Sequence, residues 1–174
     1  MSVHRLNHAV LYVRDAQRSA AFYAEALGFA PVPDMPVMPG AIFLRAPGST
    51  NDHDLGLFSV GAQAGPSAAG RGAVGLYHLA WEVDTLADLA EISERLTRLD
   101  ALVGATDHST TKALYAQDPD GLEFEVSWLV PADRIDDEVL AGRTRMSPLD
   151  IPKEIARFGA DTRSGIGVSR VVLS

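Results

Sequence analysis

A strand-and-helix unit occurs twice in this sequence, and the repeat limits the possible folds more than any other feature. Residues 6–13 have the β-branched and aromatic composition of a strand, and residues 15–28 place apolar side chains at helical spacing between an Asp and a Gly. Residues 76–83 and 84–99 follow the same order, with an Asp–Thr pair as the predicted cap of the second helix. Each of the two strands carries a histidine near its start. We therefore expect two similar modules.

Further strand patterns complete each unit. In the first unit, residues 40–45 and 53–60 are predicted to be strands. In the second, residues 112–117 and 122–129 are predicted strands on either side of an Asp-Pro-Asp-Gly sequence that is typical of a hairpin turn. Each half is therefore predicted to be a βαβββ module. Residues 31–39 contain four prolines, which disfavours a central strand there.

The repeat also predicts how the chain is divided. The expected boundaries are one domain over 1–130, with module one over 4–62, a Gly-, Ala- and Ser-rich linker over 61–75 and module two over 76–130, followed by an extension over 131–174. The extension breaks the repeat, and residues 133–141 and 152–158 are expected to form short helices in it. Its apolar end, 168–173, could add an edge strand to a neighbouring subunit.

Composition excludes several classes of protein. Lys and Arg number 15 against 23 Asp and Glu, so the formal charge of −8 argues against a general nucleic-acid binder. The chain has no cysteine, which removes disulfides, thiolate metal sites and cysteine nucleophiles. No apolar run approaches the roughly 18–20 residues of a membrane span, and residues 1–11 lack the features of a signal peptide. We therefore expect a cytoplasmic protein with neither nucleic acid nor membrane as partner.

Alternation along the strands places candidate metal ligands on one face of each strand. Glu123 and Glu125 share the face of the last strand that suits a polar cavity, and the even-numbered positions from 124 to 128 suit packing under a helix. His8 and His78 lie 70 residues apart at matched places in the repeat. A repeat need not preserve a rare residue for packing, so the match favours function. Two histidines and one carboxylate form the usual non-haem Fe(II) arrangement and leave open coordination positions.

These motifs resemble those of the vicinal oxygen chelate superfamily, which includes glyoxalase I, fosfomycin-resistance proteins, bleomycin-binding proteins and type I extradiol dioxygenases. The resemblance covers about residues 4–130 and rests on NHAV at 7–10, YHLA at 77–80 and DPDGLEFE at 118–125. It implies an α+β fold in which two paired βαβββ modules form a curved, partly open mixed β-barrel around a metal site. Helices would lie outside, with a C-terminal helical extension. The implied metal ligands are His8, His78 and Glu125.

The other histidines point to one branch of that superfamily. Residues 52–58 resemble the His-Asp strand of catechol 2,3-dioxygenase-like proteins. Residues 107–115 resemble their Asp-His-Gly stretch ending in Leu-Tyr or Ile-Tyr, with Ser109 in place of the common Gly, a departure that could move the neighbouring histidine. The resemblance implies an Fe²⁺-dependent extradiol dioxygenase that cleaves a catechol or related vicinal-oxygen substrate with dioxygen. The implied catalytic residues beside the metal are His53, which would accept and return a proton, His108 and Tyr115.

Other members of the superfamily remain as alternatives. Glyoxalase I takes a fourth ligand, a Glu, from the last strand of module one, where the repeat offset places Leu55 or Gly56, and neither residue can bind a metal. Asp54 is the nearest carboxylate, and a ligand role for it would need a register shift, so three protein ligands are favoured. The same ligands could hold Mn²⁺, Ni²⁺ or Zn²⁺ in a non-oxidative isomerase, epimerase or thiol transferase. A metal-free resistance protein that binds a small molecule is the third alternative, and the retained ligands count against it.

The sequence does not decide whether the chain forms a dimer. The resemblance suggests a homodimer, because modules of this kind often pair across subunits. One chain could also bury its own sheet edges.

Overall fold

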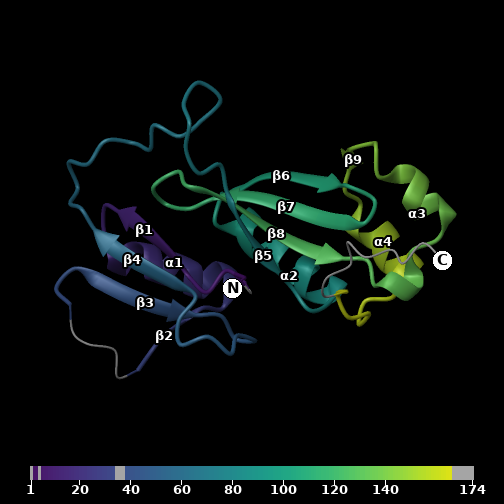
Figure 1. Cartoon of the computed structure of the whole chain (residues 1–174), viewed down its shortest axis with the longest axis horizontal. Coiled ribbons are helices and arrows are strands. Elements are labelled where there is room, and N and C mark those ends of the chain that lie inside the picture. Colours follow the sequence, from purple (N-terminus) through teal and green to yellow (C-terminus); the bar gives the residue numbers. More distant parts are fainter. Residues whose placement is uncertain (1, 4, 34–37, 166–174) are drawn as a thin grey trace. The chain divides into compact units, whose positions relative to one another are not determined.

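Two separate mixed β-sheets organise the chain, one in each repeat (Figure 1). The computed structural model describes residues 2–3, 5–33 and 38–165. It divides into two compact units, each described by itself: the first is Met1–Ala68 with Asp118–Leu122, and the second is Ala69–Gln117 with Glu123–Ser174. No helix within the described ranges has both the length and the apolar character needed to cross a membrane.

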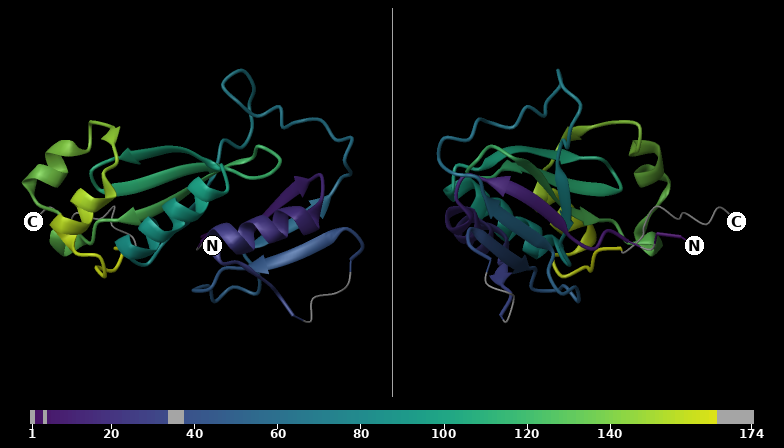
Figure 2. Two further views of the ribbon diagram at one scale, coloured as in Figure 1. Left: turned by 180° about the vertical axis from the view of Figure 1, so that it is seen from behind. Right: turned by 60° about the vertical axis from the view of Figure 1, so that its left-hand side comes forward.

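The first unit has one helix packed on a four-stranded sheet. Its elements are β1 (Ala9–Val13), α1 (Ala16–Leu27), β2 (Ala30–Pro31), β3 (Ala41–Arg45) and β4 (Leu55–Ser59). The strand order is β1-β4-β3-β2, with β1 parallel to β4 and the other pairs antiparallel. Helix α1 packs against β3 and β4 (Figure 2). Alternation decides which residues face this helix, since Leu11 and Val13 are buried whereas Val10 and Tyr12 are exposed.

Helix α1 begins and ends where the sequence predicts. The Asp15 carboxylate accepts hydrogen bonds from the backbone N–H of Gln17 and Arg18, at 2.9 and 3.4 Å. Such a cap satisfies N–H groups that have no partner inside the helix. At the other end, Gly28 has a φ of 75°, a left-handed backbone that glycine adopts without a steric penalty.

Removing this cap tests its contribution to stability. We expect Asp15→Ala to lower the free energy of unfolding by about 0.5–2 kcal/mol, the usual effect of losing an N-cap side chain. Chemical denaturation followed by circular dichroism measures the change. Gln17→Ala is the matched control, because Gln17 takes part in the cap only through its backbone N–H. Equal effects of the two substitutions would contradict a specific role for the Asp15 side chain.

The second unit repeats this plan with a five-stranded sheet. Its elements up to residue 129 are β5 (Leu79–Glu82), α2 (Leu86–Arg98), β6 (Leu102–Asp107), β7 (Thr111–Gln117) and β8 (Glu123–Leu129). The strand order is β5-β8-β7-β6-β9, in which β9 is the later strand Ser147–Pro148 and β5 is parallel to β8. The α+β class and the βαβββ repeat are therefore confirmed. The core is also as predicted, since α2 buries Leu86, Leu89 and Leu96, and β8 buries Phe124 and Trp128.

The C-terminal extension packs on the second unit. After a 3-10 turn at Ala132–Arg134, it forms α3 (Asp137–Gly142), β9 (Ser147–Pro148) and α4 (Ile151–Phe158). The two short helices are thus confirmed, although α3 is shorter than expected. Strand β9 pairs antiparallel with the end of β6, and α4 packs against α2. The predicted apolar strand at 168–173 lies outside the described residues.

Candidate metal centre

The second unit brings one predicted histidine and the predicted carboxylate together. His78 comes directly before β5, and Glu125 lies in the neighbouring strand β8, opposite Ala80. Nε2 of His78 is 3.2 Å from Oε2 of Glu125. Both side chains are largely shielded, with 25% and 13% of their surfaces exposed.

This pair fits a divalent cation. Nitrogen and carboxylate donors bind such ions at about 2.0–2.2 Å, so two donors at roughly a right angle on one ion lie about 3 Å apart. The atoms of His78 and Glu125 have that spacing. Nδ1 of His78 is buried and has no hydrogen-bond partner among the described residues. The donor types, imidazole and carboxylate, suit iron and other first-row metals.

Tyr115 and His108 lie beside this pair. Tyr115 is the residue of β7 directly opposite Glu125, and its ring centroid is 5.8 Å from that of His78. The Tyr115 hydroxyl is 2.9 Å from Nε2 of His108, and the two groups share a hydrogen bond. Burial and, after it, the nearby Glu125 carboxylate raise the pKa of Tyr115 above its usual value. The phenol therefore keeps its proton near neutral pH and can donate a hydrogen bond.

The first unit brings the other two predicted histidines together. His8 comes directly before β1 and is exposed, and its ring centroid is 4.5 Å from that of His53. Nδ1 of His8 is 2.8 Å from the amide oxygen of Asn7, whereas Nδ1 of His53 is 3.2 Å from an Asp52 carboxylate oxygen. The His53 side chain is more buried and packs edge-on against Phe43.

The six predicted site residues thus form two groups, one in each unit. Within the described residues, the structure shows no cluster of three or more His, Asp or Glu side chains that could hold a metal. It pairs His78 with Glu125 and His8 with His53. The prediction that His8 joins the other two ligands at one metal therefore stays a prediction.

Comparisons with known proteins give the family. The sequence pattern of the Glyoxalase/Bleomycin resistance protein/Dioxygenase superfamily matches residues 5–126. The chain belongs to this superfamily. No curated protein matches the sequence.

Several solved structures share the fold of this chain. A glyoxylase/bleomycin resistance protein/dioxygenase domain from Frankia sp. EAN1pec is 22% identical, with a TM-score of 0.62 over 74% of this chain and 94% of that one. A glyoxalase/dioxygenase from Nostoc punctiforme is 21% identical, with a TM-score of 0.59 over 72% and 91% of the two chains. The fosfomycin resistance protein FosX from Listeria monocytogenes, in complex with Mn(II) and a dihydroxypropylphosphonic acid, is 18% identical, with a TM-score of 0.53 over 72% and 90%.

Strand register identifies which residue of module one stands where module two has Glu125. Ala80 faces Glu125 in the second unit, and Val10, its counterpart in the repeat, faces Gly56 in the first. Gly56 is therefore the equivalent position, which decides between the two residues that the sequence left open. Glycine has no side chain to offer a metal, so module one lacks the carboxylate that glyoxalase I uses.

Asp54, the nearest carboxylate in module one, has a structural role. It is 7% exposed and accepts hydrogen bonds from three groups of the β3–β4 loop: the backbone N–H of Ala46 (2.8 Å), the hydroxyl of Ser49 (2.7 Å) and the amide of Asn51 (2.7 Å). Through these hydrogen bonds, the Asp54 carboxylate holds the β3–β4 loop closed. The set of three protein ligands stays a prediction.

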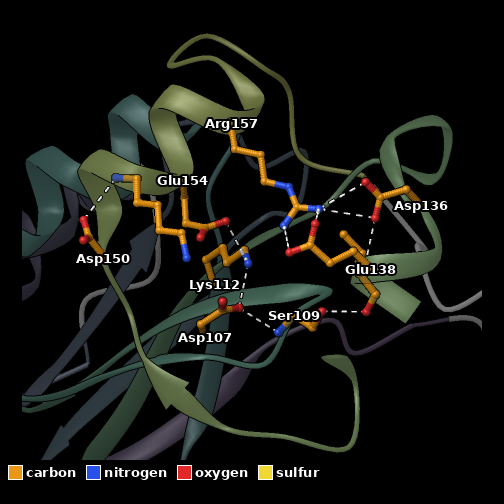
Figure 3. A network of polar contacts seen from close by, with 10 residues as sticks. Asp107, Ser109, Lys112, Asp136, Glu138, Asp150, Glu154 and Arg157 are labelled. Atoms are coloured by element: carbon orange, nitrogen blue, oxygen red, sulfur yellow. Dashed lines mark hydrogen bonds and ion pairs between the residues drawn. The ribbon is translucent and has the colours of Figure 1, made fainter. Parts of the chain in front are cut away.

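One buried charged group of the second unit escaped the sequence analysis. Lys112 is 2% exposed, and its ammonium group lies 2.6 Å from Asp107 and 2.9 Å from Glu154 of α4 (Figure 3). Asp107 and Lys112 lie on either side of the turn that carries His108, at the end of β6 and the start of β7. The sequence did indicate that this lysine is buried. Lys112 lies on the same face of β7 as Leu114 and Ala116, and both of these are fully buried.

Proposed function

We propose that this chain is a metal-dependent enzyme acting on a small molecule with two adjacent oxygen atoms, and that His8, His78 and Glu125 hold the metal. The observation that carries the proposal is the 3.2 Å approach of His78 Nε2 to Glu125 Oε2. It suits two donors of one cation, and a third donor from module one would leave open positions for a substrate. Membership of the superfamily supports this, and the related FosX structure contains Mn(II).

We further propose that the metal is Fe²⁺ and the reaction is extradiol cleavage of a catechol by dioxygen. A bound Fe²⁺ would lower the pKa of a substrate hydroxyl and hold both reactants at adjacent positions. The support for this finer proposal is the His108–Tyr115 pair next to Glu125. A simple metal-binding site has no need of a second hydrogen-bonded pair beside the ligands.

Each side chain near the ligands has a distinct task in this proposal. When the proton of the His108 ring is on Nε2, the Tyr115 hydroxyl accepts from the ring and donates its own hydrogen to a substrate oxygen. This orients the substrate and stabilises negative charge on that oxygen. His53 accepts the proton that the substrate loses and later returns it, since histidine exchanges protons near neutral pH. The Asp52 carboxylate, 3.2 Å from Nδ1 of His53, orients the ring.

Metal reconstitution with oxygen uptake tests the proposal. The protein is stripped of metal, loaded with Fe²⁺ without oxygen, and then mixed with a panel of catechols and dioxygen. We expect oxygen consumption together with a yellow ring-opened product, and His78→Ala should lower the rate by at least about 100-fold because it removes a ligand. Glu123→Gln is the matched control on the same face of β8 and should retain the rate.

The other outcomes separate the alternatives. Tight metal binding without oxygen uptake would contradict the dioxygenase and favour a non-oxidative reaction with Mn²⁺, Ni²⁺ or Zn²⁺, all of which accept the same donors. Failure to bind any divalent metal would contradict the metalloenzyme and favour a protein that binds a small molecule.

A further inference from the structure

The turn that carries His108 has a strained backbone. Ser109 has a φ of 70°, and the N–H of Thr110 donates to the carbonyl of His108 across that single residue, at 2.9 Å. This combination is typical of a classic γ-turn, which is rare and strained. Glycine adopts a positive φ readily, but a residue with a side chain does so only where its surroundings compel it. Contacts of Ser109 must therefore hold the turn in place.

Helix α3 of the C-terminal extension provides one such contact. The Ser109 hydroxyl donates to the carbonyl of Val139 at 2.6 Å, and Val139 is itself buried. Gly142, one turn further along the chain, has no side chain where Ser109 approaches. A methyl group on Gly142 would lie 2.9 Å from Cβ of Ser109 and closer still to its hydroxyl. The serine side chain thus fits a space that exists only because residue 142 is glycine.

The Asp107 carboxylate provides a second contact on the other side of the turn. Its Oδ1 atom accepts from the backbone N–H of Ser109 at 2.7 Å and from Nζ of Lys112 at 2.6 Å. Lys112 in turn pairs with Glu154, so α4 of the extension also reaches the turn (Figure 3). Strand β9, which pairs with the end of β6, adds a third connection between the extension and this turn.

We propose that Ser109 is a positioning residue for His108, and that α3 of the C-terminal extension holds it in that role. This inference rests on the proposed function, because His108 matters only as a member of that site. With Ser109 bonded to Val139, the turn directs the His108 ring to the Tyr115 hydroxyl, 2.9 Å from Nε2. When that bond is lost, the strained turn relaxes and the His108–Tyr115 hydrogen bond weakens.

Two substitutions break this contact from opposite sides. Ser109→Gly removes the hydroxyl that anchors the turn to α3 and leaves a glycine, which can adopt or leave the left-handed backbone at little cost, so the turn is no longer fixed. Gly142→Ala keeps Ser109 and fills the space that its side chain needs, although Gly to Ala within a helix is ordinarily stabilising. We expect both to shift the NMR signal of the His108 Cε1–H group in the metal-free full chain toward that of a free histidine. The signal is assigned with His108→Asn.

The double variant and activity complete the test. Ser109→Gly with Gly142→Ala should resemble Ser109→Gly alone, because the side chain that the new methyl group would strike is gone. If the proposed reaction is found, each single variant should lower kcat by about 10-fold, with KM and metal affinity nearly unchanged. Ala141→Ser, on the exposed part of α3, is the matched control and should change nothing.

The His108 signal decides the inference independently of the proposed function. An unchanged signal in Ser109→Gly and in the double variant would overturn it, even if the melting temperature fell, because a merely structural contact would affect stability alone. Absence of catechol cleavage in the wild-type protein would overturn the proposed reaction and leave the NMR result as the measure of positioning. If Gly142→Ala fails to fold, Ser109→Gly and the double variant still give the answer.

Discussion

Replacement of Lys112 by methionine is expected to lower the free energy of unfolding by about 3–5 kcal/mol, because it leaves a buried carboxylate without its partner. Glu154 is 3% exposed and lies 2.9 Å from the Lys112 ammonium group. Methionine keeps the length of the side chain and its packing near the Phe158 ring. The loss of stability therefore reflects mainly the removed positive charge. Stabilities of whole domains are about 5–15 kcal/mol, so this single change removes a large share.

Urea denaturation of matched variants measures this effect. Lys153→Met, on the exposed side of α4, is the control and should change stability little. Lys112→Met combined with Glu154→Leu should recover most of the loss, since replacing a whole buried pair by apolar residues is often neutral. Asp107 can stay charged in this double variant because it is 23% exposed. A double variant no more stable than Lys112→Met would mean that the loss comes from packing rather than from the unpaired carboxylate.

The elements that local sequence rules govern were predictable. The caps at Asp15 and Gly28 and the buried face of β8 follow from residue type and spacing alone, and the structure has them as predicted. Strand β6 was not delineated, since Gly104 and Ala105 have low strand propensity. It is a strand because β7, which follows across a short turn, and β9, which comes much later in the chain, provide hydrogen-bond partners on its two sides.

The candidate site was likewise predictable only in part. The repeat identified His8 and His78 as candidate ligands, and the alternation of side chains along β8 identified Glu125. Which residues lie opposite one another depends on strand register. Only the register shows that Gly56 is the counterpart of Glu125. The burial of Lys112 could have been read from the alternation along β7, but its partner in α4 and the contact of Ser109 with α3 could not, because the repeat does not describe the path of the extension.

Metal affinity should fall by more than about 100-fold when Glu125 is replaced by glutamine, since removal of an outer contact alone typically costs 10–100-fold. Glutamine keeps the size of the side chain but removes the negative charge and one of the two strong donor oxygens. Titration of the metal-free protein with Fe²⁺ under anaerobic conditions, or with Zn²⁺ in air, measures the change without requiring any catalysis. Glu123→Gln, two residues away on the same face of β8, should keep wild-type affinity.

The two histidines of module one then decide which of them is the third ligand. We expect His8→Ala to weaken metal binding as strongly as Glu125→Gln, and His53→Ala to leave it nearly unchanged. The rings lie 4.5 Å apart, so both variants disturb the same surroundings, and only loss of a donor separates them. Loss of affinity in His53→Ala alone would make His53 the ligand and remove it as the proton acceptor. Full affinity in both variants would show that the metal is held by module two without module one.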